Sequence, residues 1–227
     1  MSDLALQTGT LGFLQKLAAN NNREWFQENK ELYNMAKADF ENFVSQLIQI
    51  FDHQLGLENV KAKSCIYRIY KDVRFSKDGT LYKTEFGATV AADGKKTTKA
   101  ALHLYIKHDQ QVFVDIGTCH MSPKDLGNVR SAIDYDASGL EAFLESEDFK
   151  ETFAGELIGD QLKSAPRGYS VDHKSIELLR YKNFSIRSVM KFEDLTSSEA
   201  EQQIRNIVKA ATPFRNFLNK ALEFSEQ

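Results

Sequence analysis

The sequence predicts an α+β fold: one domain over residues 1–227, with a central antiparallel β-meander and helices packed at the N- and C-terminal ends. Segments with helical spacing flank a middle region of short, alternating segments joined by turns, and no linker or internal repeat interrupts the chain. With 227 residues, of which 42% are hydrophobic, the chain is near the upper size for a single hydrophobic core.

Two helices are expected before the strands. Leu11, Leu14 and Leu17 share one stripe of a helix over 11–19, with Thr10 as its N-cap. Asn22 is expected to cap a second, long helix, in which apolar residues recur at helical spacing as far as about residue 55. Gly56 should end this helix in a left-handed conformation.

Four strands are expected to form the meander, at Ser64–Tyr70, Thr84–Ala92, Ala100–Lys107 and Val112–Thr118. The connection Lys77-Asp78-Gly79-Thr80 is typical of a turn. The third strand alternates, with leucines and an isoleucine directed inward and His103, Tyr105 and Lys107 directed outward. One face of the sheet should therefore be solvated or line a cleft.

Helical signals return after the meander. Ser122 and Pro123 are typical of a helix start, and the helical pattern reaches Ile133 and resumes over Leu140–Phe153. Asp172 is expected to cap a short helix around Ile176–Arg180.

The end of the chain combines a strand with further helix. Asn183–Met190 alternates like a strand. The run Thr196-Ser197-Ser198-Glu199 fits a capping box, and Pro213 should kink or split the helical segment that follows.

Composition excludes several classes of protein. No apolar run is long enough to span a bilayer, and Met1–Asn20 lacks the basic start and apolar centre of a signal peptide. A cytoplasmic location and no membrane partner are expected. Cys65 and Cys119 are far apart in sequence and should be unpaired, as in a reducing compartment.

Positive charge is concentrated in two basic islands. Residues 61–86 carry a balance of +4 and residues 162–191 a balance of +5, which leaves −12 for the remainder of a chain whose net charge is −3. Such asymmetry is informative about partners rather than about fold.

The first island contains the strongest site candidates. In an extended segment Arg68, Asp72 and Arg74 share one face, so two arginine forks could bind phosphate or carboxylate while Asp72 orients one of them. Lys77, Tyr82 and Lys83 would add charge and hydrogen bonds from the turn and the next strand. A salt-bridged lattice on an exposed sheet face explains the same residues equally well.

The second island supplies Lys163, Arg167 and Arg180. Gly168 could allow close approach of a backbone, although basic residues near a helix end are also explained by the helix dipole alone. We hypothesise that both islands converge on one cleft, because two like-charged patches that meet without a counter-ion would repel.

Other chemistry has little support. The five histidines show no paired ligand spacing, and there is no phosphate-binding loop, dinucleotide fingerprint or nucleophile elbow, so neither a metal nor a cofactor is predicted. Tyrosines and phenylalanines among the bases would allow stacking on single-stranded nucleic acid. A pI near 6.0 argues against a general nucleic-acid binder.

Several motifs resemble a bacterial and fungal family of unknown function, domain of unknown function 2461. They are Asn21-Asn22-Arg23-Glu24-Trp25-Phe26 with Asn29-Lys30 and Tyr33, the run from Arg68 to Asp78, Tyr82-Lys83-Thr84 with Phe86-Gly87, Leu162-Lys163, Pro166, Gly168-Tyr169, and Leu178-Leu179-Arg180. The resemblance covers nearly the whole chain. It implies a shared fold and a shared site location, and it supplies no reaction.

Two functions follow as expectations. The first is a binding or enzymatic site for a phosphorylated small molecule or nucleotide, where phosphoryl or phosphodiester transfer could rely on positioning and electrostatics. The alternative is a non-catalytic interaction module whose basic face docks an acidic protein partner in a salt-sensitive manner.

Overall fold

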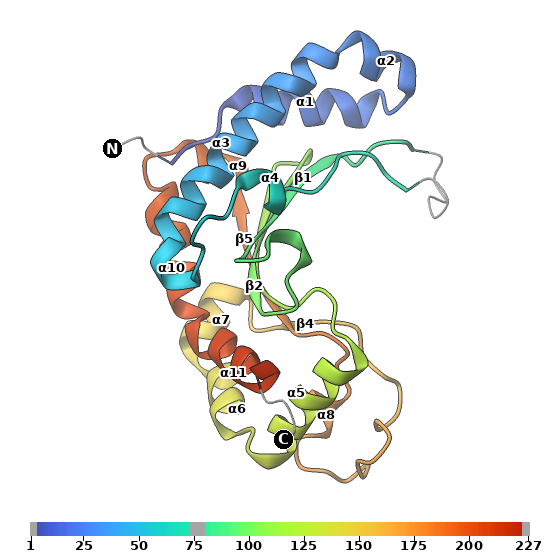
Figure 1. Cartoon of the computed structure of the whole chain (residues 1–227), viewed down its shortest axis with the longest axis vertical. Coiled ribbons are helices and arrows are strands. Elements are labelled where there is room, and N and C mark those ends of the chain that lie inside the picture. The colour runs from blue at the N-terminus through green and yellow to red at the C-terminus, as the bar shows by residue number, and fades with distance from the viewer. Residues whose placement is uncertain (1–3, 73–79, 224–227) are drawn as a thin grey trace. The chain divides into compact units, whose positions relative to one another are not determined.

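The computed structural model describes residues 4–72 and 80–223, and Figure 1 shows the order of the elements. The helices are α1 (Thr8–Ala19), α2 (Arg23–Glu28), α3 (Lys30–Leu55), α4 (Ala62–Cys65), the 3-10 helix η2 (Gly94–Lys96), α5 (Pro123–Tyr135), α6 (Ser138–Glu145), α7 (Glu147–Phe153), α8 (Ile176–Leu179), α9 (Phe192–Thr196), α10 (Ala200–Ala210) and α11 (Thr212–Glu223). The strands are β1 (Glu85–Val90), β2 (Ala101–Lys107), β3 (Gln111–Gly117), β4 (Leu157–Ile158) and β5 (Ser185–Lys191).

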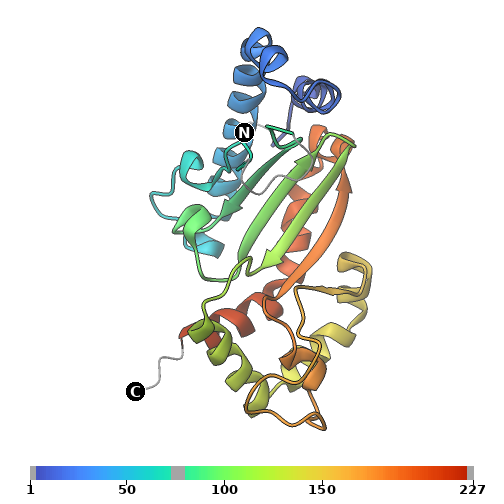
Figure 2. The same cartoon turned by 90° about the vertical axis from the view of Figure 1, so that its right-hand side faces the viewer.

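The predicted α+β class with an antiparallel meander is confirmed. The described strands form one antiparallel sheet in the order β1-β2-β3-β5-β4, so the first three are sequential neighbours (Figure 2). Strand β4, which the sequence analysis missed, pairs at its two residues with β5, Leu157 opposite Ile186 and Ile158 opposite Ser185. A strand of only two residues has too little alternation to be recognised.

Contacts divide the chain into two compact units. The first unit is Met1–Thr97, His103–Val114 and Val189–Arg205, and the second is Thr98–Leu102, Asp115–Ser188 and Asn206–Gln227. The single-domain organisation therefore stays a prediction, and the two units are described separately.

The N-terminal helices of the first unit follow the prediction except at two points. Asn22 caps α2 by accepting the backbone N–H of Trp25 at 2.9 Å, and Gly56 ends α3 with φ of 65°. The expected long helix is interrupted at Asn29, whose side chain donates to the carbonyl of Trp25 at 2.9 Å. An asparagine can satisfy backbone groups with its own amide, so it favours a helix end inside an apolar-periodic run.

Thr10 does not cap the first helix, as had been predicted. Helix α1 begins earlier, with Gln7 at the cap position. The carboxylate of Asp39 accepts both the backbone N–H of Gln7 and the hydroxyl of Thr10, which is buried. A carboxylate from α3 thus satisfies the helix N-terminus that a local hydroxyl was expected to satisfy.

The prediction of a continuous strand at Ser64–Tyr70 is wrong. Its first residues belong to the short helix α4, and the remainder pairs through isolated antiparallel bridges, Ile66 with Ala88 and Tyr70 with Tyr82. The hydroxyl of Ser64 bonds the carbonyl of Lys61 at 2.7 Å and thereby favours the helical turn. Of the predicted turn at 77–80, only Thr80 lies within the described residues.

The alternation of the central strands is confirmed within the first unit. Leu104, Ile106, Val112 and Val114 are buried, and α3 packs against β1, where the rings of Phe40 and Phe86 stack at 5.3 Å. His103 belongs to the opposite face and is nevertheless buried.

In the second unit, Ser122 caps α5 as predicted, accepting the N–H of Asp125 at 3.1 Å. The helical stretch Leu140–Phe153 is divided into α6 and α7 at Ser146, which caps α7 by accepting the N–H of Phe149 at 3.2 Å. The cap position of α8 is held by Ser175 and not by Asp172.

The C-terminal predictions are confirmed in outline. Strand β5 covers Ser185–Lys191, and the last helical segment is split into α10 and α11 next to Pro213. The predicted capping box does not form at Thr196, because this residue ends α9 and its hydroxyl donates to the carbonyl of Glu193 at 2.8 Å. Among the described residues, no helix combines the length and apolarity needed to cross a bilayer.

Candidate anion-binding site

The site residues predicted in the first island do not all lie on the same face of their segment. The ring of Tyr82 is buried and stacks on Phe26 at 4.0 Å, whereas Lys83 Nζ lies 5.4 Å from the ring centre of Tyr67. Consecutive side chains of an extended segment point to opposite faces, so Tyr82 and Lys83 serve different surfaces.

Of the remaining first-island candidates, Arg68 and Asp72 lie within the described residues. Arg68 is exposed, and no ion pair joins it to another described residue. Asp72 is half-buried and has an interaction partner. Arg74 and Lys77 lie outside the described residues.

A cationic–aromatic arrangement around Lys30, here called the Lys30 cluster (Lys30, Phe26, Tyr33, Tyr70 and Tyr82), is the most specific feature of this unit. Lys30 Nζ lies 4.9 Å from the ring centre of Phe26, 4.7 Å from that of Tyr33 and 5.9 Å from that of Tyr70. It also donates to the hydroxyl of Tyr70 at 3.4 Å. Three aromatic faces within about 6 Å of one ammonium group fix its position by cation–π attraction.

Aromatic rings, and no carboxylate of the residues that the structure describes, surround the charge of Lys30. Among the described residues, no Asp or Glu oxygen lies within ion-pair distance of its Nζ. Aromatic faces attract a cation but leave its formal charge uncompensated, so an anion that reaches this ammonium group gains a full charge–charge interaction.

The phenols of the cluster are close enough to affect one another. Burial raises the pKa of Tyr33 above its ordinary value, and Tyr70 adds to the increase. The pKa of Tyr82 is raised by the same two causes, while the positive charge of Arg23 opposes the increase. The hydroxyls of Tyr33 and Tyr82 therefore stay protonated near neutral pH, and a protonated phenol can donate a hydrogen bond to an anionic oxygen.

The side chain of Asn21 fixes the position of this cluster. Its Oδ1 accepts the backbone N–H groups of Leu81 and Tyr82 at 3.1 and 3.0 Å, and its Nδ2 donates to the carbonyl of Tyr82 at 2.9 Å. Tyr82 in turn pairs with Tyr70 through a backbone bridge. The loop before α2 thus holds both tyrosines against the ring of Phe26 in α2.

A second polar chain lies on the other face of the same segment. The hydroxyl of Tyr67 is 2.6 Å from Oγ1 of Thr89, which is 2.8 Å from Nδ1 of His103. Thr89 and His103 are buried, and Tyr67 stacks on Tyr105 at 6.3 Å. The hydrogen bond with Thr89 satisfies one ring nitrogen of His103 and so makes the burial of this polar side chain tolerable.

Gly87 allows the tyrosine pair to come so close. A Cβ at this position would lie 2.8 Å from Cδ1 of Tyr105 and 3.1 Å from Cδ2 of Tyr67. Any larger residue would therefore displace these two rings.

The second island lies in the second unit and is partly committed to internal contacts. Arg180 pairs with Glu177 at 2.8 Å, although its Nε is buried without a hydrogen-bond partner in the described part of the chain. Lys163 and Arg167 are exposed. Because Arg68 belongs to one unit and Arg180 to the other, convergence of the two islands stays a prediction.

Arg130 secures the segment that carries Arg180. It donates from Nε to the carbonyl of Leu179 at 2.9 Å and from Nη2 to the carbonyl of Tyr181 at 3.2 Å, and burial lowers the pKa of its guanidinium. Sequence reasoning gave Arg130 no role, since a lone arginine in a helix carries no local signal.

The sequence analysis also gave no site role to Lys30 or Tyr33. Both residues stand in the motifs that carried the family resemblance, which was the one signal pointing to them. Within residues 4–72 and 80–223, no group of three or more His, Cys, Asp or Glu side chains is placed to hold a metal ion.

Fold and site together define an α+β protein with a cationic–aromatic cluster next to a bridged, charged segment. A family model described as "Conserved hypothetical protein (DUF2461)" matches residues 9–217, and the chain belongs to this family. No curated protein and no solved structure matches the chain. The matched range includes the Lys30 cluster and the second island.

Proposed function

We propose that the chain binds a phosphorylated small molecule or nucleotide, with the Lys30 cluster and the exposed Arg68 as the binding surface. The observation that carries the proposal is the ammonium group of Lys30, held by aromatic rings and unpaired with any carboxylate of the described residues. Phosphate oxygens accept hydrogen bonds from ammonium, guanidinium and phenol groups, all of which this surface contains.

The aromatic character of the cluster supports a ligand with a flat ring as well as a phosphate. The side chain of Tyr70 is 43% exposed although it belongs to a cluster of packed rings, so part of its surface is available to solvent. Stacking of a base on an exposed tyrosine contributes about 1–3 kcal/mol. A nucleotide would combine this contact with the charge of Lys30.

The test is thermal unfolding of the full chain with inorganic phosphate, pyrophosphate, AMP, ATP and a sugar phosphate. A ligand present at about 100 times its Kd should raise the melting temperature on the order of 5 °C. Lys30→Met keeps the apolar stem and removes the charge, and it should abolish the shift.

The matched control is Lys37→Met, which removes an exposed lysine from the same helix. It should leave the shift intact. If no anion stabilises the parent, or if Lys30→Met responds as the parent does, the proposal is wrong.

The contribution of Asp72, Arg74, Lys77 and Lys83, and of Lys163, Arg167 and Arg180 from the second island, stays a prediction. So does phosphoryl or phosphodiester transfer, because the proposal concerns binding alone. A cytoplasmic location is likewise proposed, supported by two cysteines that are both free, one of them buried.

The exposure of Lys163, Arg167 and Lys182 favours a second candidate, an interaction module that docks an acidic protein. Its association should weaken steeply with ionic strength, since exposed charges are screened within about 8 Å at physiological salt. Pull-down at several salt concentrations with the triple variant Lys163→Gln, Arg167→Gln, Lys182→Gln tests it. A partner retained equally by the parent and the variant would argue against this candidate.

A further inference from the structure

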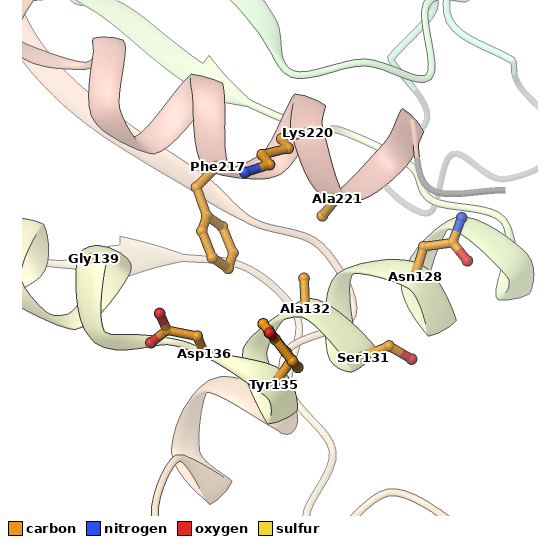
Figure 3. A pocket seen from close by; sticks show the side chains of 9 residues that line it. All are labelled: Asn128, Ser131, Ala132, Tyr135, Asp136, Gly139, Phe217, Lys220 and Ala221. Atoms are coloured by element: carbon orange, nitrogen blue, oxygen red, sulfur yellow. The ribbon is translucent and has the colours of Figure 1, made fainter. Parts of the chain in front are cut away.

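The second unit contains a pocket of about 690 Å³ that the proposed function does not use. Its volume lies within the range of about 300–1,000 Å³ typical of small-molecule sites. Nine residues line it: Asn128, Ser131, Ala132, Tyr135, Asp136, Gly139, Phe217, Lys220 and Ala221 (Figure 3).

Seven of the nine lining residues come from one stripe on each of two helices, α5 and α11. Residues 128, 131, 132 and 135 of α5 follow the i, i+3, i+4, i+7 spacing of a single helix face, and residues 217, 220 and 221 of α11 do the same. The two helices also contact each other, and Val129, Ile133 and Leu218 are buried. The pocket therefore lies along two helices whose relative position is fixed by packing.

Ring faces and small residues determine the shape of the pocket. Phe217 reaches from α11 toward the side that carries Tyr135 and Asp136 (Figure 3), and Tyr135 is 91% exposed. Alanines at 132 and 221 and a glycine at 139 leave the space between them open. Such a mostly apolar lining with two aromatic side chains suits a flat, apolar body.

The charges at the pocket are not equally compensated. The carboxylate of Asp136 accepts the backbone N–H of Ser138 at 2.9 Å, and these hydrogen bonds, with the nearby charge of Lys174, lower its pKa. Lys220 is exposed and pairs with no carboxylate of the described residues. The two formal charges at the pocket cancel, but the ammonium group of Lys220, which pairs with no described carboxylate, can still bind an anionic group on the ligand.

We propose that this pocket binds a small aromatic carboxylate, with the ring between Phe217 and Tyr135 and the carboxylate at Lys220. The hydroxyl of Ser131 and the amide of Asn128 supply further hydrogen-bond donors at the pocket. All these residues belong to the second unit, so the inference does not depend on the proposed function.

The probe is 1-naphthaleneacetate, compared with the uncharged 2-(1-naphthyl)ethanol, titrated calorimetrically into the full chain. Both should bind, the carboxylate more tightly. Lys220→Met should weaken the carboxylate about fivefold and leave the alcohol unchanged, since an exposed charge pair contributes up to about 1 kcal/mol. Lys124→Met, at an exposed position of α5, serves as the charge control.

Gly139→Leu tests the location of the site. A Cβ at Gly139 meets no atom within 4 Å, so a leucine can fill the pocket without disturbing the fold. Binding of both probes should be lost while the melting temperature is not lowered. Gly127→Leu is the matched control, because Gly127 also lies in a helix with open space around its Cβ and does not line the pocket.

Three results would overturn the proposal: no binding of either probe, binding that survives Gly139→Leu, or equal loss of both probes in Lys220→Met. A fourth contradicting result could come from sedimentation of the parent protein. If the molecular mass rises with concentration and Gly139→Leu prevents the rise, the pocket is covered by a second copy of the chain and not by a small ligand.

Discussion

Asn21 and Tyr82 are 61 positions apart, and the side chain of the first bonds both backbone groups of the second. The amide oxygen of Asn21 accepts the N–H of Tyr82 at 3.0 Å, and its NH₂ group donates to the carbonyl at 2.9 Å. This reciprocal pair ties the loop before α2 to the segment that carries the candidate site. It is the contact from which the geometry of the Lys30 cluster follows.

Replacing Asn21 by alanine should destabilise the first unit. The change removes three hydrogen bonds, including one from Leu81 N–H, and a net value of about 1 kcal/mol for each predicts a loss of about 2–3 kcal/mol. Urea unfolding measures the loss. Asn20→Ala is the control, because Asn20 is exposed and bonds only a local carbonyl; it should cost less than 1 kcal/mol, roughly. Equal losses would show that the tie does not stabilise the fold.

Gly87→Ala should destabilise the fold, even though alanine is ordinarily more stable than glycine in the interior of a strand or helix. The added Cβ would lie 2.8 Å from the ring of Tyr105, and displacing the ring should cost about 1–3 kcal/mol. Gly12→Ala should instead stabilise the protein, by up to about 1 kcal/mol. Gly12 lies in α1, and a Cβ added there would meet no atom within 4 Å. Thermal unfolding of both variants tests these two predictions. A Gly87→Ala variant as stable as the parent would contradict the first of them.

Arg187 and Asp115 form an ion pair within the second unit, in which Asp115 is nearly buried and the Arg187 side chain is 31% exposed. Nε and Nη2 of Arg187 each donate to one oxygen of Asp115 at 2.7 Å, and the Asp115 side chain is 9% exposed. Arg187→Met leaves the carboxylate without this partner and should cost about 3–5 kcal/mol.

The double variant Asp115→Leu, Arg187→Met should lose much less than the sum of the two single variants, because neither charge is then left alone. Urea unfolding of the parent, the two single variants and the double variant gives the coupling free energy between the two side chains. Additive losses would mean that the two side chains contribute independently.

Stability should decline at alkaline pH partly through Tyr82. Burial and Tyr70 raise its pKa above 10.0, so the folded state binds the phenolic proton more tightly than the unfolded chain does. The resulting stabilisation is fully present below pH 10.0 and is lost as the pH rises through the folded pKa, at no more than about 1.4 kcal/mol per pH unit.

Tyr82→Phe removes this proton and should make the decline above pH 10.0 shallower. Tyr135→Phe, at a side chain that is 91% exposed, should leave the decline as steep as in the parent. Denaturant unfolding at several alkaline pH values measures the slopes. A Tyr82→Phe slope equal to that of the parent would contradict the prediction.

The fold could be predicted where a local signal determines it. Alternation along β2 and β3, the caps at Asn22 and Ser122, and the glycine that ends α3 all act within a few residues of their own position. The helix breaks at Asn29 and Ser146 were missed because the apolar spacing continues across them. A period describes which face is buried and says little about a single polar residue that interrupts the hydrogen-bond ladder.

The candidate site could be predicted only in part, because charge density is a poor guide to a site that depends on rings. Lys30 stands alone in sequence, and its aromatic neighbours come from positions 26, 33 and 70. Tyr82 was expected to face a ligand together with Lys83, and its ring instead stacks on Phe26. Phe26, Lys30 and Tyr33 are spaced as on one helix face, a local signal that was missed. Tyr70 and Tyr82 join them only through tertiary packing.

The single residue between α2 and α3 has a consequence for how the family can vary. Each residue added to an α-helix turns it by about 100°. Inserting or deleting one residue at Asn29 would rotate the start of α3 and carry the ammonium of Lys30 away from Phe26, with every side chain unchanged. We therefore expect relatives to keep the number of residues at this junction.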